Sequence, residues 1–438
     1  MNARVSPGGS PALSIVAPFF FAAPFGLVVG GLLLAGSDRT AFLAINVQRT
    51  VAVTHALLLG WLTTAMMGAL YQMGPAVLGG RLLSERLARV QFAVHVTALP
   101  LFVWALFRWE TGWMAIAGSG LALSLTLFLV NAITAAVRGT TWNLPRGFVA
   151  TSLGFLIAVG AVGTTYALAT RFAWFPITLG RLSAHAHLGL VGWVALTVMG
   201  LSYQLVPMFN VVNKVRPRFG WWVLGATGGG LALFATAAAF EAPRVVLQAA
   251  AVVVAIGPLL WAADMIRLLR ARSRRQLDVQ GRATCVGIVF LVVAAGLGLT
   301  MAMAGESAWP NEPARLPLAY AAAAVAGWAG TVFIGNSYKI LPFLIWLHRY
   351  RPLAGREPVP LTRDIYSDGA ATAVLVIHAV TTATVILGAM TGQLTILRLG
   401  GAGLAVGGLA HLATLGHMFL PKRTSRWRED IPIAPMAR

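Results

Sequence analysis

The sequence predicts an all-α, polytopic membrane protein with about 12 transmembrane helices in three pseudo-symmetric four-helix units. Three observations carry this prediction: the composition, the distribution of basic residues and an internal repeat. The chain has 438 residues, of which 58% are hydrophobic and 11% are charged, and its mean hydropathy is +0.77. A soluble protein of this length needs more polar surface. Apolar runs of about 20 residues, enough to cross a bilayer as a helix, recur along the chain.

Twelve segments are predicted to be helices. They are 14–35, 51–78, 88–108, 113–136, 148–170, 178–208, 220–240, 245–267, 283–305, 318–345, 369–391 and 396–420. Of the 33 Lys and Arg residues, 24 fall at the termini and in one set of alternating loops, and 8 in the other set. Because cytoplasmic loops are enriched in basic residues, we expect a multi-pass protein of a bacterial-type inner (cell) membrane with both termini cytoplasmic. The net charge of +20 then faces lipid headgroups, and no nucleic-acid partner is expected.

An internal repeat divides the chain. The first two copies read Arg49…His55-x4-Gly60-Trp61-x5-Met67-Gly68-x2-Tyr71-Gln72-x2-Pro75 and Arg181…His187-x4-Gly192-Trp193-x5-Met199-Gly200-x2-Tyr203-Gln204-x2-Pro207, with a constant offset of 132 residues. A third copy follows 135 residues later, from Gly327-Trp328 to Pro342, with Ala322 at the histidine position. The repeat predicts three units of four spans each, 1–140, 141–280 and 281–438, arranged as a ring with an enclosed space between successive units.

Carboxylates and cysteine offer little chemistry inside the membrane. The single cysteine, Cys285, rules out an internal disulfide framework and a Cys-based metal centre. None of the 13 acidic residues falls clearly in a membrane core, since Asp264 lies one turn from Arg267. Proton pumps and ion-coupled carriers usually bury carboxylates, so this pattern weighs against both.

The polar residues with metal-binding side chains that the predicted spans do contain are histidines. His55 and His187 occupy equivalent positions in two repeats, and His185 lies two residues before His187. A spacing of two turns a helical side chain by about 200°, so His185 and His187 should face opposite sides of one helix. A zinc site would prefer a spacing of three or four. We therefore predict that His55, His185 and His187 ligate haem, with interhelical hydrogen bonding as the alternative.

Other polar residues in or near the spans carry weaker expectations. His95, His378 and His411 are expected to be structural, with haem or copper ligation as the alternative. Arg49 and Arg181 each precede a repeat histidine by six residues, or about 9 Å along the helix. At the membrane edge each could pair with a haem propionate, and ordinary interfacial anchoring is the alternative.

The segment from His185-Ala-His187 to Phe209 resembles subunit I of haem–copper oxidases. That family carries His-x-His on a late helix, followed at the same intervals by a glycine, a proline and often a phenylalanine, which Gly200, Pro207 and Phe209 match. The family has twelve spans in three arcs. It also has a haem-ligating histidine near the start of its second helix, a position that His55 matches. The sequence is also similar to haem- and copper-containing membrane proteins of the nitric oxide response.

The resemblance implies a b-type haem and suggests copper, with departures. The family's His-x-His lies in the third arc, whereas here it lies in the second, and the His-His pair of the copper site is absent. If the units are matched directly, His55 and His187 are the two axial ligands of one haem and His185 faces a second compartment. With a shift of one unit, His55 and His95 fall at copper-ligand positions and His185 becomes the facing haem ligand.

These observations predict a haem-binding integral membrane redox protein with an incomplete copper centre. Its role would be electron transfer, or oxygen or nitric oxide chemistry where the iron keeps an open position. The chain has no Cys-x-x-Cys-His, so the haem is not expected to be covalent, and a separate cytochrome or a partner subunit would supply electrons. Non-enzymatic haem or copper handling and small-molecule transport are the alternatives, and no residue is assigned a catalytic role.

Overall fold

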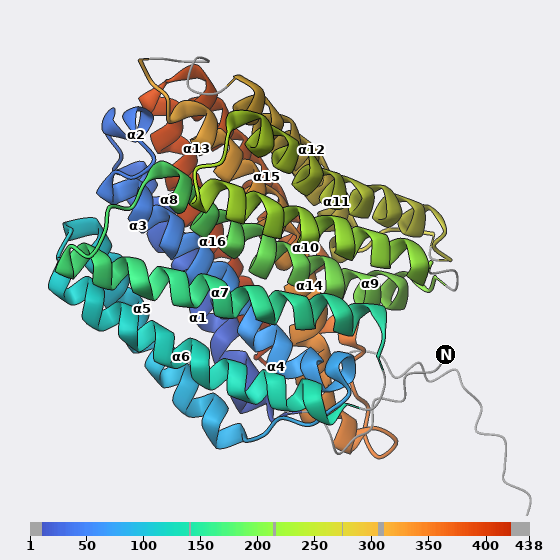
Figure 1. Ribbon diagram of the computed structural model, residues 1–438. Coiled ribbons are helices and arrows are strands. Elements are labelled where there is room, and N and C mark those ends of the chain that lie inside the picture. The colour runs from blue at the N-terminus through green and yellow to red at the C-terminus, as the bar shows by residue number, and fades with distance from the viewer. Residues whose placement is uncertain (1–10, 140–141, 213–215, 274, 305–310, 422–438) are drawn as a thin grey trace, which may run out of the picture.

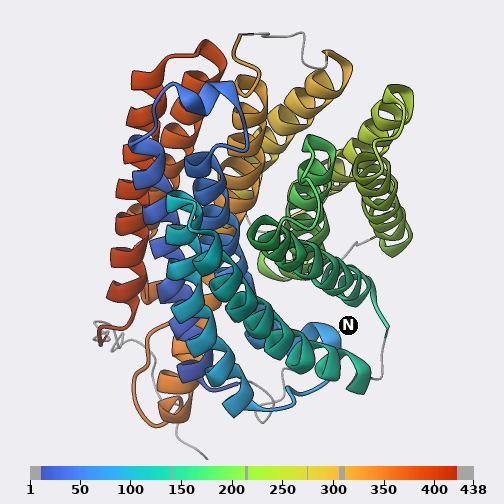
Figure 2. The same ribbon diagram turned by 60° about the vertical axis from the view of Figure 1, so that its left-hand side comes forward.

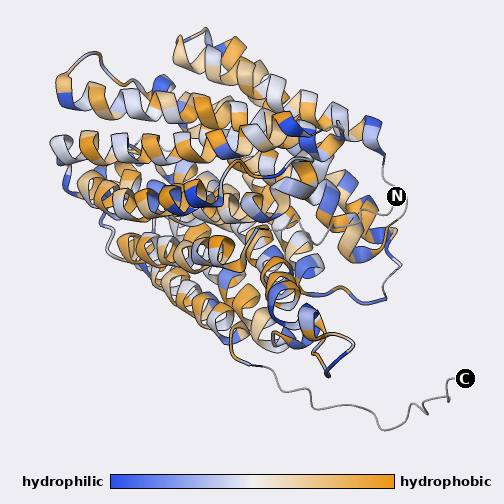
Figure 3. Ribbon diagram, turned by 90° about the horizontal axis from the view of Figure 1, so that it is seen from below, coloured by the Kyte–Doolittle hydropathy of each residue, from blue (hydrophilic) through white to orange (hydrophobic). Residues whose placement is uncertain are grey.

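The computed structural model describes residues 11–139, 142–212, 216–273, 275–304 and 311–421 (Figure 1). In this part of the chain, 12 helices are long and apolar enough to cross a membrane. Hydrophobic residues cover most of their length (Figure 3). The protein is therefore an all-α, multi-pass membrane protein, and this prediction from the sequence is confirmed.

The helices follow the expected order. The first unit contains α1 (Leu13–Ala35), α2 (Thr40–Leu43), α3 (Gln48–His55), η1 (Ala56–Thr63), α4 (Thr64–Leu78), α5 (Glu85–Arg108) and α6 (Thr111–Arg138). The second contains α7 (Leu144–Phe172), α8 (Leu179–His187), η2 (Leu188–Ala195), α9 (Leu196–Asn210), α10 (Pro217–Ala239) and α11 (Arg244–Arg270). The third contains α12 (Val279–Ala304), α13 (Arg315–Ala321), η4 (Ala322–Gly330), α14 (Thr331–Ile345), η5 (Trp346–Tyr350), η6 (Arg351–Leu353), η7 (Thr362–Asp364), α15 (Asp368–Thr391) and α16 (Leu394–Met418).

Polar side chains fix where several spans begin. Ser84, Asn143, Thr178 and Ser367 each accept a hydrogen bond from the backbone N–H three residues later. Such caps satisfy one of the four N–H groups that a helix start leaves without an intrahelical partner. The spans therefore start within a few residues of their predicted positions.

The second span of each unit contains a π-helical segment at the same place in the repeat. These segments are η1, η2 and η4, and they interrupt α-helix on both sides. A π-turn accommodates an extra residue and shifts the register of the following side chains, and such turns are frequent at functional sites. In the first two units the π segment begins directly after His55 and His187, and in the third it begins at the equivalent Ala322.

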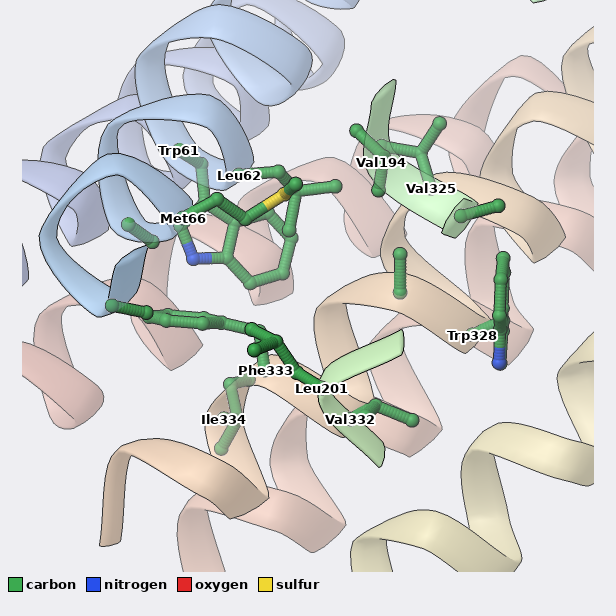
Figure 4. Close-up of a cluster of buried hydrophobic side chains, with 14 of the residues drawn as sticks. Trp61, Leu62, Met66, Val194, Leu201, Val325, Trp328, Val332, Phe333 and Ile334 are labelled. Atoms are coloured by element: carbon green, nitrogen blue, oxygen red, sulfur yellow. The ribbon is translucent and has the colours of Figure 1, made fainter. Parts of the chain in front are cut away.

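The three π segments meet at the centre of the molecule, where each contacts the other two. Tryptophans of the repeat cross the unit boundaries there: the Trp193 indole N–H donates to Thr63 Oγ1 at 3.0 Å. A Cβ on Gly330 would lie 2.2 Å from the Trp61 ring, so this glycine lets the first and third units approach closely. Figure 4 shows Trp61 and Trp328 in this apolar core. The fold is thus three pseudo-symmetric four-helix units around one centre.

The ring closes between the first and last spans. α1 packs along α16, as the blue and red helices of Figure 2 show. The two helices approach closely at Gly31 and Gly401, because a Cβ on either would lie 2.6 Å from the other helix's backbone. The exact unit boundaries, 1–140, 141–280 and 281–438, stay a prediction.

Candidate functional site

The π segments leave His55 and His187 in the same local conformation. His55 Nδ1 lies 2.8 Å from the Val51 carbonyl oxygen, and His187 Nδ1 lies 2.8 Å from the Ser183 carbonyl oxygen. A carbonyl only accepts, so Nδ1 carries the hydrogen in both rings. In the neutral imidazole the Nε2 lone pair is then available to accept a hydrogen bond or to ligate a metal.

His55 faces His185 across the boundary between the first and second units. The ring centroids are 6.3 Å apart and the ring planes differ by 23°. Phe102 packs edge-on against His55, and Tyr166 packs against His185 at 5.7 Å. A Cβ on Gly163 would lie 2.9 Å from the His185 ring, so only a glycine there leaves room for that ring in its present position. We call His55 and His185 the His–His pair.

His187 faces Tyr320 across the next boundary, between the second and third units. The Tyr320 hydroxyl lies 3.2 Å from His187 Nε2, which accepts its hydrogen bond, and the ring centroids are 5.8 Å apart with planes at 22°. Phe234 packs against His187 at 4.6 Å. Gly298 adjoins Tyr320, since a Cβ there would lie 3.1 Å from the phenol ring. We call His187 and Tyr320 the His–Tyr pair.

The two pairs are repeat-related copies of one arrangement. Two residues of the first pair correspond to residues 132 positions later: His55 to His187, and Phe102 to Phe234. The other two correspond to residues 135 positions later: Gly163 to Gly298, and His185 to Tyr320. At the third boundary the equivalent residues are Ala322 and Val53. The chain therefore presents one histidine–histidine, one histidine–tyrosine and one apolar version of the same inter-unit arrangement.

This pairing differs from the assignment in which His55 and His187 flank one haem. The structure places His55 beside His185, while His187 contacts Tyr320 and Phe234. The physical reason is the two-residue spacing, which turns His185 and His187 to opposite sides of α8. The assignment with a shift of one unit, in which His185 is the haem ligand that faces a copper site at His55 and His95, stays a prediction.

The described residues do not build a histidine-rich copper centre. In this part of the chain no group of three or more His, Cys, Asp or Glu side chains lies close enough to hold a metal ion. His95, which the shifted assignment would place at copper, bonds instead to Thr64 Oγ1 at 2.9 Å and to Ser124 Oγ at 3.3 Å. Among the described residues, the His–His pair offers two imidazoles and no third histidine, cysteine or carboxylate ligand.

Three other histidines have structural partners. His378 Nε2 donates to the Ala326 carbonyl inside η4 at 2.9 Å. At the equivalent place in the first unit, the Thr64 hydroxyl donates to the Leu59 carbonyl inside η1 and is itself bonded to His95. These bonds satisfy carbonyls that the π register leaves exposed to the neighbouring helix. His411 Nε2 lies 2.9 Å from the hydroxyl oxygen of Ser337 on α14.

The two repeat arginines hold the N-terminal end of the second spans, six residues before His55 and His187. Arg49 Nη1 donates to the Leu33 carbonyl at 3.2 Å, and its guanidinium stacks over Phe107. Arg181 Nη1 donates to the Pro176 carbonyl at 2.8 Å and lies over Phe175. These contacts are those of interfacial anchors, and the propionate role of Arg49 and Arg181 stays a prediction.

One acidic residue near a helix end is buried within the protein. The Asp264 side chain is 2% exposed and forms an ion pair with Arg267, whose Nε lies 2.7 Å from Oδ1. The expectation that Asp264 lies outside the membrane core stays a prediction, since burial between helices does not measure depth in the membrane. The carboxylate is neutralised by a guanidinium one turn away, so it is a paired group rather than an ion carrier.

Sequence reasoning did not identify Tyr320, Gly163 or Gly298 as site residues. The signal was nevertheless present, because Tyr320 stands 135 positions after His185, which is the offset of the third repeat. In each unit the facing residue lies two positions before the repeat histidine position. The repeat alignment, continued by two residues toward the N-terminus, therefore locates every facing residue. A single tyrosine in an apolar run carries no such information by itself.

Comparisons with known proteins bear on the fold. No protein-family model matches the chain, and no curated protein sequence matches it. Among solved structures it is similar to a heme-copper terminal oxidase dimer determined by cryo-EM, with a TM-score of 0.63 and 13% sequence identity over 94% of this chain and 85% of that chain. The chain therefore has the fold of a haem–copper terminal oxidase.

Proposed function

We propose that this chain is a haem-binding integral membrane redox protein whose haem is held by His55 and His185. The observation that carries the proposal is the His–His pair. Imidazole nitrogens bind first-row metals at about 2.0–2.1 Å, so two rings on opposite sides of one ion have centroids roughly 6 to 6.5 Å apart. The observed separation of 6.3 Å fits this requirement.

Three further features of the His–His pair support a metal-bearing ring at this position. His55 Nδ1 is held by a backbone carbonyl, the second partner that orients most metal-binding imidazoles. His185 Nδ1 is buried and has no hydrogen-bond partner among the described residues, a cost that ligation would offset. Phe102 and Tyr166 provide aromatic walls. These residues supply the two imidazoles and the aromatic contacts that would hold a b-type haem.

A haem with two histidine ligands supplies one-electron transfer. Within this arrangement the chain's own residues orient the imidazoles, keep them neutral and exclude water. Electron transfer is accordingly the activity that we propose. The cytoplasmic placement of both termini and location in a bacterial-type inner membrane are part of the same proposal.

The test is a detergent-purified protein from haem-replete cells. We expect a reduced-minus-oxidised spectrum of b-type haem in the wild type, and its loss in both His55→Ala and His185→Ala. His187→Ala, in the repeat-related copy, is the matched control and should keep the spectrum. A colourless wild type, or haem that survives both substitutions in the His–His pair, would contradict the proposal.

Non-enzymatic haem handling is the second candidate function. It is favoured by the absence, among the described residues, of a three-histidine group that could complete a copper centre. Supplying electrons to the haem-loaded protein in the presence of oxygen or nitric oxide separates the two candidates. Haem content without consumption of either gas would favour handling or sensing.

A further inference from the structure

A cavity of about 800 Å³ lies between the second and third units, with α11 on one side and α12 on the other. The two helices run side by side in Figure 1. Small apolar residues such as Ala251 on α11 and Ala295 on α12 line the space between them. Ile256 and Val292, which lie close to this lining on the same two helices, are exposed. Because exposed apolar residues of a membrane span face lipid, the cavity borders the surrounding bilayer.

The cavity has the depth of one membrane leaflet. On α11 its lining begins at Arg244, the first residue of the helix, and ends at Pro258. These two residues are 14 positions apart, or about 21 Å along the helix axis. Trp328 lines the inner end, where it packs edge-on against Trp261 at 5.6 Å. One leaflet, from the bilayer centre to the outside of the headgroups, is about 20–22 Å thick, so the two lengths agree.

The polar groups inside the cavity already have partners in the protein. His187 Nδ1 donates to the Ser183 carbonyl, and its Nε2 accepts from the Tyr320 hydroxyl. Gln248 donates to the Ala302 carbonyl at 3.3 Å, which joins α11 to α12. A polar ligand would have to replace one of these hydrogen bonds, whereas an apolar chain leaves all of them intact. The interior of the cavity therefore favours a hydrocarbon chain.

Two charged residues of opposite sign lie at the outer end of the cavity. Glu241 and Arg244 are three residues apart in the turn that joins α10 to α11, and both are exposed and line the cavity. Arg244 donates to the Met303 carbonyl on α12 at 2.7 Å, which holds its guanidinium there. A guanidinium has five N–H donors and binds phosphate, and a carboxylate accepts hydrogen bonds from an ammonium group. The outer end therefore matches a headgroup that carries both charges.

We propose that this cavity holds one phospholipid with a phosphoethanolamine headgroup, as a structural part of the protein. The phosphate binds Arg244, the ammonium group binds Glu241, and the acyl chains extend between α11 and α12 toward Pro258. Phosphocholine fits less well, because its quaternary nitrogen has no N–H to donate to Glu241. A headgroup with a net negative charge leaves Glu241 without a counter-charge. The inference goes beyond the haem proposal and does not depend on it.

The role of this lipid is to fill the space between the second and third units. Protein interiors contain few voids larger than a water molecule, because the lining of an empty cavity lacks contacts on one side. Acyl chains supply those contacts to both helices. The lipid thus holds α11 and α12 at their present separation.

The experiment uses the full-length protein in detergent, equilibrated with equal amounts of palmitoyl-oleoyl phosphatidylethanolamine, phosphatidylcholine and phosphatidylglycerol. Native mass spectrometry then counts the lipids that each chain retains after a detergent wash. We expect one phosphatidylethanolamine per chain, preferred over each of the other two by about threefold or more. A chain that retains no phospholipid, or retains the three equally, would overturn the proposal, since the protein then binds only annular lipid.

Substitutions on both walls test the location. Ala255→Trp on α11 and Ala295→Phe on α12 fill the cavity, and each should abolish the retained lipid. Ile256→Trp and Val292→Phe add the same side chains at nearby exposed positions and should keep it. Equal retention in the filled and control variants would refute the site. Phosphatidylethanolamine with a diazirine in its acyl chain gives a second readout in the unsubstituted protein. Its cross-links should fall on lining residues such as Val254, and cross-links at exposed positions alone would also refute the site.

Two further variants test the headgroup. Arg244→Gln should lower the retention of phosphatidylethanolamine by roughly threefold, the effect of one exposed ionic contact. Glu241→Gln should remove the preference for phosphatidylethanolamine over phosphatidylcholine. Arg171→Gln, at another exposed arginine, is the control for the loss of one positive charge. If the Arg244 and Glu241 variants both behave like this control, the headgroup assignment is wrong. A colourless protein that keeps the lipid would contradict the haem proposal alone.

Discussion

Tyr320 lies against His187 in the same arrangement in which His185 lies against His55. The centroid separations are 5.8 and 6.3 Å and the interplanar angles are 22° and 23°. The difference is chemical: the phenol donates a hydrogen bond to its histidine, whereas His185 offers a second nitrogen ligand. One repeated geometry thus produces two sites with different ligand preferences.

Gly163→Ala is expected to reduce haem binding. The new Cβ would lie 2.9 Å from His185 Cε1, so the imidazole must move out of its present position. Overpacking of this kind costs about 1–3 kcal/mol, and we expect the haem-to-protein ratio under limiting haem to fall by about fivefold or more. Gly154→Ala on the same helix is the control, because its Cβ would meet nothing within 4 Å. Equal haem content in the two variants would argue against a ligand role for His185.

Asp264→Ala is expected to destabilise the protein. It leaves Arg267, which is 27% exposed, without its buried carboxylate partner. Breaking a fully buried pair costs about 3–5 kcal/mol, and the partial exposure of Arg267 lowers our expectation to about 1–3 kcal/mol. Thermal unfolding in detergent measures the change. Asp368→Ala, which removes a more exposed pair with Arg282, should change the stability by less than about 1 kcal/mol.

Much of the fold could be predicted from the sequence because span formation is decided locally. Each span needs only a run of about 20 apolar residues, and such runs can be recognised directly in the sequence. The π segments could not be predicted, since α and π registers share the same residues and differ only in which carbonyl each N–H meets. The π segments recur at the same place in each unit and contact one another at the common centre.

The candidate site could be predicted in part. The two-residue spacing of His185 and His187 indicates that they face different compartments, and the contacts of the two rings agree. The residue that each histidine contacts depends on how the three units are oriented around the ring. Sequence spacing gives no information about that orientation. His55 could therefore be paired with either histidine until the units were placed in space. The burial of Asp264 between helices could not be predicted, because its distance from a helix end does not reveal packing by neighbouring helices.

His378→Ala is expected to lower stability without removing haem. The substitution opens a cavity at a fully buried position and leaves the Ala326 carbonyl in η4 without its donor. Together these changes should cost about 2–5 kcal/mol, measured as the unfolding midpoint in detergent. His378→Gln keeps an N–H donor and should recover part of the loss. If His378→Ala instead unfolds like the wild type and has lost its haem spectrum, the histidine is a ligand rather than a structural donor.

Tyr320→His is expected to create a second haem site. The substitution gives the second boundary the same facing residues as the first, a histidine on each side, with Phe234 and Gly298 in the places of Phe102 and Gly163. The adjacent cavity of about 800 Å³ provides space that a porphyrin needs. We expect the haem-to-protein ratio, determined from extracted haem, to rise from one to two per chain. Tyr320→Phe lacks a nitrogen ligand and should stay at one, and an unchanged ratio in Tyr320→His would show that facing imidazoles are insufficient for haem binding in this fold.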